Sequence, residues 1–434
     1  MGFPLLMNRL ERHVYDLVRR NPPLKLLLRN TYQGLFDLIP VQACNSAYPI
    51  TAREGYFFGF HDHTPFSPDN KLLLANRYSI RLRMPRENDE LEVGFFHGDN
   101  FRIWHPVGTT RSWNWHQGCK LQWCGLRPEL IYNDFVKGKF IARIHNIETG
   151  EVQELSYPIS SVSPDGCWAV GYSFERVQKY MPGYGYPQRT NESSIAYKRP
   201  NDTGLFLIDL QTGISRQLLN IADVAAYQPE FGSDDLWHFV SHTIFCPSSQ
   251  RIAFLHRWVP KDTRFLKSRM FTCDLNGENW HLFSTREMVS HLGWRNAQQI
   301  VAYCRLPDGR DQYVLFTDRV PGAGEILGEG IFSSDGHPCF SPDGRWMLTD
   351  TYPDRTRRSY LILFDIETNY RYNLAYLRSP RRFATTHPQR HWACDLHPRF
   401  DRTGRYICFD ATYTGRRSLC TIDLGEVDSK VKSL

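Results

Sequence analysis

The sequence lacks the features that would place it in a membrane or mark it for export. No stretch approaches the roughly 20 apolar residues of a membrane span. The start of the chain reaches Arg9 and Arg12 before any apolar run long enough for a secretory signal. The 11 cysteines are scattered and odd in number, which without an export signal indicates reduced thiols. We therefore expect a cytoplasmic protein.

A strong charge of one sign is also missing. The chain has 52 Lys and Arg against 46 Asp and Glu, a net charge of +6, and its basic runs are short, as at Arg19-Arg20. A mildly basic surface suits an anionic partner such as an acidic polysaccharide, a nucleic acid or a membrane surface, and the net charge does not choose among them. We expect no nucleic-acid partner. The sequence does not determine the oligomeric state.

The composition favours many short strands joined by tight turns, because aromatic residues make up 14% of the chain beside 30 Gly and 26 Pro. Residues 8–40 differ: their apolar residues recur at helical intervals on both sides of Pro22-Pro23. We predict a short α-helical extension over residues 1–47. Its helices pack on the main domain or, being basic and amphipathic, make a peripheral contact with the inner membrane face.

From residue 48 onward one unit recurs: a short strand, a turn of the Ser-Pro-Asp-Gly type, and an apolar strand. Seven copies begin at residues 63, 120, 159, 242, 291, 337 and 397, and each is followed by further strand pattern. Units of about four strands at a regular period are typical of a propeller. We predict an all-β, seven-bladed β-propeller over residues 48–434. Residues 48–56 should complete the last blade and close the ring.

A histidine keeps its place in this repeat. The residue four positions before the turn is histidine in five of the seven units: His63, His242, His291, His337 and His397. The first strand of a blade lines the axis, so these side chains should gather at one face, together with the polar ends of the second strands: Arg77, Arg257, Arg305, Asp350 and Asp410. Converging imidazoles indicate a metal site or an acid–base site; the alternative is a set of separately hydrogen-bonded core residues.

For the metal site, three of these histidines lie in consecutive blades, and two cysteines are near them in sequence. A subset of five residues is predicted to hold a divalent ion, zinc or manganese: His291, His337, Cys339, Cys394 and His397. Asp350 and Asp410 are the expected hydrogen-bond partners of the imidazoles.

A second polar cluster is expected near the first blades. It combines the sequence GFHDH around His63, the sequence WNWHQG around His116, and the loop KYMPGYGYPQR around Tyr184. The loop lies on the long connection 174–203, and connections of this length are usually functional or disordered. It is either a sugar-binding platform with tyrosine as an acid, or an ordered surface loop.

Several stretches carry a resemblance to a known superfamily. The units HPCFSPDGRWMLTD and DLHPRFDRTGRYICFD, with GFHD, WNWHQG, PGYGY, FLHRW and LTDTYPD, resemble the propeller polysaccharide lyases, both oligogalacturonate lyases and ulvan-lyase-like proteins. The resemblance implies a metal held by histidines on inner strands, catalysis by His and Tyr, and an Arg that neutralises a uronate carboxylate. By motif it points to His242, His337 and His397, with Tyr184 and Arg257. Where oligogalacturonate lyases show H-P-H-P, this chain has Asp395-Leu396-His397-Pro398, so one imidazole is replaced.

The leading hypothesis is a lyase or lyase-like protein that cleaves an acidic, uronic-acid-containing oligo- or polysaccharide by β-elimination. Its candidate catalytic residues are His63, His116, His242, Tyr184 and Arg257. Two alternatives remain: a non-catalytic propeller that binds glycan in bacterial surface-polysaccharide metabolism, and a protein-interaction scaffold. A propeller-bearing serine peptidase is disfavoured, because the chain shows no G-x-S-x-G elbow and no hydrolase domain outside the predicted propeller.

Overall fold

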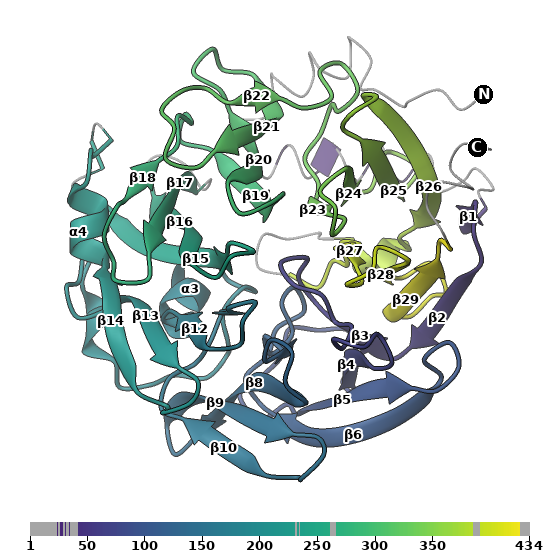
Figure 1. Ribbon diagram of the computed structural model, residues 1–434, viewed down its shortest axis with the longest axis horizontal. Helices are drawn as coiled ribbons and strands as arrows, with labels where there is room; N and C mark the ends of the chain where they lie inside the picture. The colour runs from purple at the N-terminus through teal and green to yellow at the C-terminus, as the bar shows by residue number, and fades with distance from the viewer. Residues whose placement is uncertain are drawn as a thin grey trace.

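The computed structural model describes residues 42–425 except 231, 234, 261–265 and 385–390, and the separate positions 24, 27, 28, 31 and 34. Within these residues the strands form seven antiparallel sheets around a central axis (Figure 1). This arrangement confirms the all-β, seven-bladed propeller. The predicted helical extension covers residues 1–47. Apart from those five positions, residues 1–41 lie outside the described residues, and within residues 42–47 the chain forms a strand at Cys44–Ser46 instead of a helix.

The blades follow the chain in order. Blade 1 comprises β3 (Tyr56–Phe57), β4 (Leu73–Tyr78), β5 (Leu91–His97) and β6 (Ile103–Thr110). Blade 2 comprises β7 (Gln122–Trp123), β8 (Glu129–Val136), β9 (Lys139–Asn146) and β10 (Val152–Leu155). Blade 3 comprises β11 (Ser161–Val162), β12 (Trp168–Gly171), β13 (Gly204–Asp209) and β14 (Ser215–Asn220). Blades 4 and 5 comprise β15 (Trp237–Phe245), β16 (Arg251–Val259), β17 (Lys267–Asp274) and β18 (His281–Leu282), then β19 (Val289–Trp294), β20 (Gln299–Arg305), β21 (Asp311–Thr317) and β22 (Glu325–Ile326).

The last two blades also contain strands from the beginning of the chain. Blade 6 comprises β23 (Cys339–Phe340), β24 (Trp346–Asp350), β25 (Arg358–Asp365), β26 (Tyr370–Arg378) and, at its edge, β1 (Cys44–Ser46). Blade 7 comprises β27 (Arg399–Phe400), β28 (Tyr406–Ala411), β29 (Ser418–Asp423) and β2 (Ile50–Glu54). The β2–β29 pairing, which sets Ile50 opposite Ile422, closes the ring.

The recurring turn explains why the repeat was visible in the sequence. In blades 3 and 6 the serine hydroxyl of the turn accepts the backbone N–H five residues on: Ser163 from Trp168 (2.9 Å) and Ser341 from Trp346 (3.0 Å). The turn ends on a glycine in the left-handed region, as at Gly344 (φ +71°), a conformation that glycine adopts without steric cost. The motif therefore fixes a hairpin between the first and second strands of each blade.

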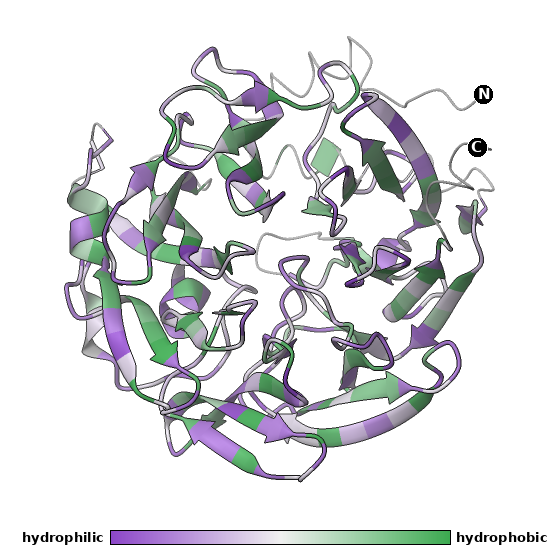
Figure 2. Ribbon diagram, in the orientation of Figure 1, coloured by the Kyte–Doolittle hydropathy of each residue, from purple (hydrophilic) through white to green (hydrophobic). Residues whose placement is uncertain are grey.

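The hydrophobic core lies between neighbouring blades. The residues just before the turns form an apolar column: Phe66, Trp123, Phe245, Trp294 and Phe400 are buried, and Val162 and Phe340 are half-buried. Burial of such a side chain contributes about 1.5–3 kcal/mol. Figure 2 shows hydrophilic residues on the turns and on outer strands such as β10. Among the described residues, none of the helices is long and apolar enough to span a membrane.

Residues 172–203 carry short helices instead of further strand. Helix α3 (Phe174–Tyr180) and the 3-10 helix η1 (Ser193–Ala196) fold back over blades 3 and 4, and α4 (Ile221–Ala226) follows β14. The buried Arg176 holds this connection in place, since its guanidinium donates to the carbonyls of His238 (2.7 Å) and Ser194 (3.0 Å). Tyr184 lies on the same connection, between α3 and η1, and reaches the axis.

Candidate metal and catalytic site

Four of the five histidines that stand four residues before a turn meet at the axis. The ring centres of His291 and His337 are 4.1 Å apart, and those of His337 and His397 are 4.2 Å apart. The ring of Phe60 lies among them, 5.0 Å from His397 and 5.1 Å from His242. All four imidazoles are buried. The prediction that inner-strand histidines converge is therefore confirmed for blades 4 to 7.

Blade 1 departs from that phase. Its inner strand, β3, ends at Phe57, and the chain then crosses the axis before the turn, so His61 lies beside His337 (ring centres 5.3 Å apart) in place of His63. Nε2 of His63 instead lies 3.1 Å from the carbonyl oxygen of Leu121, and its Nδ1 lies 2.6 Å from Asp62. His63 thus has partners away from the cluster, while Nε2 of His61 is buried without one.

The crossing depends on Gly59. This residue has φ +122°, and a Cβ atom there would lie 2.7 Å from the carbonyl carbon of Gln117. We expect Gly59→Ala to lower the free energy of unfolding by at least about 1–3 kcal/mol, because a strained backbone and a steric clash add up. Gly150→Ala is the matched control, since Gly150 has φ +76° but open space around it. Denaturant unfolding checks the difference; equal losses in the two variants would contradict the close packing at Gly59.

The backbone is strained in three blades at the repeat position that the axial histidines occupy. Lys120, His242 and His397 each stand four residues before a turn, and each has a positive φ, of 58°, 53° and 45°. Such conformations cost about 1–3 kcal/mol each for residues other than glycine and are concentrated at functional sites. In blade 4 the strain coincides with a bulge between Ser241 and Ile244 in the pairing of β15 with β16.

Asp350 at the end of β24 organises two of the histidines. One carboxylate oxygen accepts the backbone N–H of His337 (2.8 Å) and contacts Nδ1 of its ring (2.7 Å); the other accepts the backbone N–H groups of Leu396 (3.0 Å) and His397 (3.1 Å). A carboxylate beside Nδ1 fixes the ring so that Nε2 keeps its lone pair. The expected pairing of Asp350 with an imidazole is confirmed. Asp410 instead accepts backbone N–H groups of residues 58 and 59.

We expect Asp350→Asn to weaken binding of a divalent cation by about 10–100-fold, the typical cost of removing a partner of a metal-binding imidazole. The amide keeps the shape of the side chain but no longer favours the Nδ1–H form of His337. Calorimetric titration with Mn²⁺ measures the effect. Asp365→Asn, on the same blade and paired with Arg345, serves as the control and should bind as the native protein does.

Three side chains form a group able to hold a metal ion. Ligand atoms of His337, Asp395 and His397 lie within 4.8 Å of one another, and all three residues are buried. Among the residues that the structure describes, Nε2 of His397 has no hydrogen-bond partner, which is costly for a buried polar atom unless a ligand binds it. Two imidazoles and one carboxylate suit a divalent transition metal such as manganese, iron or zinc. These residues therefore fit the expected cofactor.

The group of three shares His337 and His397 with the five residues predicted to hold a metal and adds Asp395. Cys339 directs its thiol to the carbonyl of Pro398 and Cys394 to that of Asp395. Burial raises the pKa of both thiols to about 12, and neither sulfur belongs to the group of three. His291 lies beside His337 but outside the group of three. Asp395 was missed, although it stands two residues before His397, the spacing that sets two side chains on one side of an extended chain.

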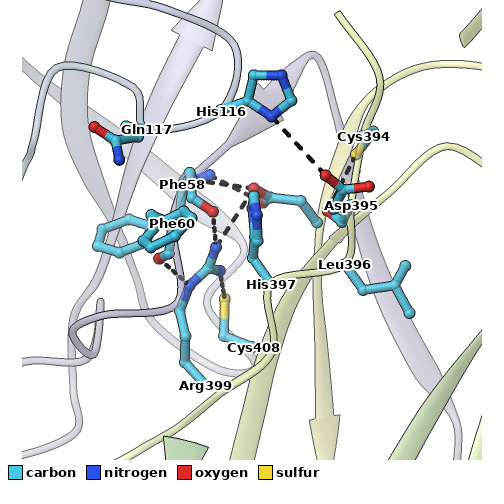
Figure 3. A network of polar contacts seen from close by, with 12 residues as sticks. Phe58, Phe60, His116, Gln117, Cys394, Asp395, Leu396, His397, Arg399 and Cys408 are labelled. Atoms are coloured by element: carbon cyan, nitrogen blue, oxygen red, sulfur yellow. Dashed lines mark hydrogen bonds and ion pairs between the residues drawn. The ribbon is translucent and has the colours of Figure 1, made fainter. Parts of the chain in front are cut away.

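A second group of predicted residues lies next to this one. The ring of His116 stacks on that of Tyr184 (4.6 Å, 5°), and Tyr184 lies 5.9 Å from His242. Nδ1 of His116 is 3.9 Å from a carboxylate oxygen of Asp395 (Figure 3). Within the described part of the chain, neither nitrogen of this buried ring has a hydrogen-bond partner. A cavity of about 290 Å³, the site-side cavity, is lined by these residues among others: His116, Tyr184, Tyr352, Phe383, Cys394 and Asp395.

Of the three arginines expected at this face, only Arg257 is there. It is buried, and its Nε donates to the hydroxyl of Ser241 (3.2 Å), which also contacts Nδ1 of His242 (2.9 Å). Arg77 and Arg305 lie farther out and pair with acidic residues on neighbouring strands, at 3.2 Å and 2.7 Å. Those side chains are directed to the blade surface because they sit opposite carboxylates in the strand register.

Burial sets the protonation of the site. It lowers the pKa of His116 and His242 well below the ordinary value, and Arg417 and Arg257 lower them further. It raises the pKa of Tyr184 above its usual range. At neutral pH these are two neutral imidazoles and one protonated phenol, so the site offers proton acceptors beside a proton donor. Burial also raises the pKa of Asp395 to about 7 and lowers that of Arg257 to about 10.

Comparison with known proteins supports the fold. No family model and no curated protein sequence matches the chain. Among solved structures, an oligogalacturonate lyase in complex with manganese is similar with a TM-score of 0.60 at 15% identity, over 89% of this chain and 96% of that one. An oligogalacturonate lyase from Vibrio parahaemolyticus is similar with a TM-score of 0.55 at 13% identity, over 88% and 94%. The chain thus has the propeller fold of these lyases.

Proposed function

We propose that this propeller is a metal-dependent polysaccharide lyase that cleaves an acidic, uronic-acid-containing oligo- or polysaccharide by β-elimination. The observation that carries the proposal is the juxtaposition at one face of a metal-ligand group, His337, Asp395 and His397, with the stacked pair of His116 and Tyr184. A binding module has no need for unpartnered buried imidazole nitrogens beside a phenol. The propeller fold shared with oligogalacturonate lyases supports the same reading.

The reaction requires a base, an acid and a neutraliser of charge. The base removes the proton at C5 of the uronate, the electron pair forms the C4–C5 double bond, the bond from C4 to the glycosidic oxygen breaks, and that oxygen takes a proton. A divalent cation held by the ligand group would neutralise the uronate carboxylate and stabilise the charge that develops on it. Arg257, buried and cationic, adds a second positive charge on the far side of Tyr184.

The two proton-transfer roles follow from position. His116 lines the site-side cavity and has two unpartnered nitrogens, so it is placed to accept the C5 proton. Tyr184 stacks against it and is placed to protonate the leaving oxygen. His242, on the other side of Tyr184, has Nδ1 engaged by Ser241 and orients the phenol. His63 does not line the site-side cavity, so it has no role in the proposed reaction.

The test is an assay of Mn²⁺-loaded protein with oligogalacturonate and with sulfated and mixed uronate chains. Elimination should produce an unsaturated uronate that absorbs in the ultraviolet, together with a new chain end seen by mass spectrometry. Measurable binding without absorbance for every chain would instead support a glycan-binding propeller.

A further inference from the structure

The axial channel is crossed by one segment of chain, residues 58–63, which we call the axial loop. It connects β3 to the first turn and carries Phe60 between the imidazoles of His242 and His397. Phe60 and His61 are both buried. The loop therefore occupies the place where a propeller of this size would otherwise have an open axial channel.

The axial loop is tied to blade 7 by a buried charged pair. Nε of Arg399 donates to the carbonyl of Phe60 (2.9 Å), and its guanidinium also donates to the carbonyl of Gly59. Asp410 accepts the backbone N–H groups of Phe58 (3.0 Å) and Gly59 (2.9 Å). Arg399 lies 3.5 Å from Asp410 and over the ring of Phe58. Figure 3 shows Arg399 directed at the loop from the segment that follows His397.

Three other blades hold the same loop. The buried ammonium of Lys120 in blade 2 pairs with Asp62 at 2.5 Å, Asn76 in blade 1 donates to the carbonyl of Phe58 (2.8 Å), and Nδ1 of His61 lies 3.1 Å from the carbonyl of Pro338 in blade 6. Because a carbonyl only accepts, Nδ1 of His61 carries the proton. Loop and ring are thus joined on several sides, which is the mark of a fixed element and not of a moving gate.

The two ends of the axis hold separate cavities. The site-side cavity lies toward His116 and Tyr184. A cavity of about 350 Å³, the turn-side cavity, lies at the other end and is lined by the axial loop and by the turns of the blades. Among the described residues the two linings have none in common. Cys394 lines the site-side cavity and Cys339 the turn-side cavity, so each end has its own native thiol.

We propose that the axial loop is a built-in plug, sealed by Phe60, that divides the channel, so that His116 and Asp395 are reached only through the site-side cavity, which both residues line. A linear polymer then cannot thread through the ring. If the proposed function holds, on which this consequence rests, an acidic chain that reaches His116 enters and leaves on the site-side face.

The plug is tested without substrate or metal. Tyr352 lines the site-side cavity and is 42% exposed, so Tyr352→Cys can be blocked with a polyethylene-glycol maleimide. Reaction of Cys394 and Cys339 with a small disulfide reagent is then followed by peptide mass spectrometry. Blocking should slow Cys394 by about tenfold or more and leave Cys339 within about twofold. Burial raises the pKa of both thiols to a similar value, so a change in the rate of one of them alone reports its access. Equal slowing of both, or of neither, would overturn the plug.

A variant of Phe60 supplies the control. Phe60→Ala should connect the two cavities, so that blocking position 352 no longer protects Cys394, whereas Phe60→Leu keeps the seal and the protection. Circular dichroism checks that each variant is folded. If Phe60→Ala does not fold, the comparison of blocked and unblocked protein with native Phe60 still tests the plug.

If no chain is cleaved, the proposed function fails, and the thiol experiment still decides on the plug.

Discussion

Replacing both His337 and His397 by Ala should abolish stoichiometric binding of Mn²⁺ and, with it, cleavage of an acidic oligosaccharide. The two imidazoles are two of the three donors in the ligand group. The loss in affinity should exceed the roughly 10–100-fold cost of removing an outer partner, because here the ligands themselves are gone. Metal analysis after dialysis and calorimetric titration provide the measurement.

The matched control is His105→Ala, because His105 is an exposed histidine on the outer strand β6. It should retain metal binding and activity. Unchanged metal content in the double variant would show that the axial histidines are core residues, as in an interaction scaffold, and would contradict the site described here.

The second large effect is expected at His116. His116→Asn should reduce kcat for β-elimination by about 10²–10⁴-fold, the usual contribution of a positioned general base, which corresponds to roughly 3–5 kcal/mol of transition-state stabilisation. Asparagine keeps a polar side chain beside Asp395 but cannot accept the C5 proton. Steady-state kinetics with Mn²⁺-loaded protein measure the change.

A metal titration separates this role from damage to the metal site. His116→Asn should bind Mn²⁺ nearly as the native protein does, because His116 lies outside the ligand group. Tyr184→Phe should show a loss of activity of similar kind, since it removes the phenolic proton and leaves the stacking. A native kcat in both variants would exclude them from the chemistry.

Sequence reasoning found the blades because each is marked by local chemistry. Ser163 and Ser341 fix their turns through contacts within five residues, so the signal repeats along the chain. The same phase predicted the convergence of His242, His291, His337 and His397, since a repeat position maps onto one place in a ring.

The structure departs from the sequence-based predictions where the chain leaves the repeat. The repeat position predicted His63 at the axis, whereas the axial loop brings His61, two residues earlier, to that place. No local feature of the sequence marks this offset. Asp395 precedes its blade and joins His337 only across the boundary between two blades. Arg77 and Arg305 were misplaced because their outer partners come from the register of neighbouring strands, which the sequence does not show.

We propose that the axial group of His337, Asp395 and His397 holds the metal on which the lyase activity of this propeller depends. The direct measurement is ultraviolet absorbance during incubation with oligogalacturonate, first with protein stripped by a chelator and then after addition of Mn²⁺. We expect no absorbance change from the stripped protein and a steady increase once Mn²⁺ is restored. The same rate with and without metal, or no absorbance in either state despite binding of the chain, would contradict it.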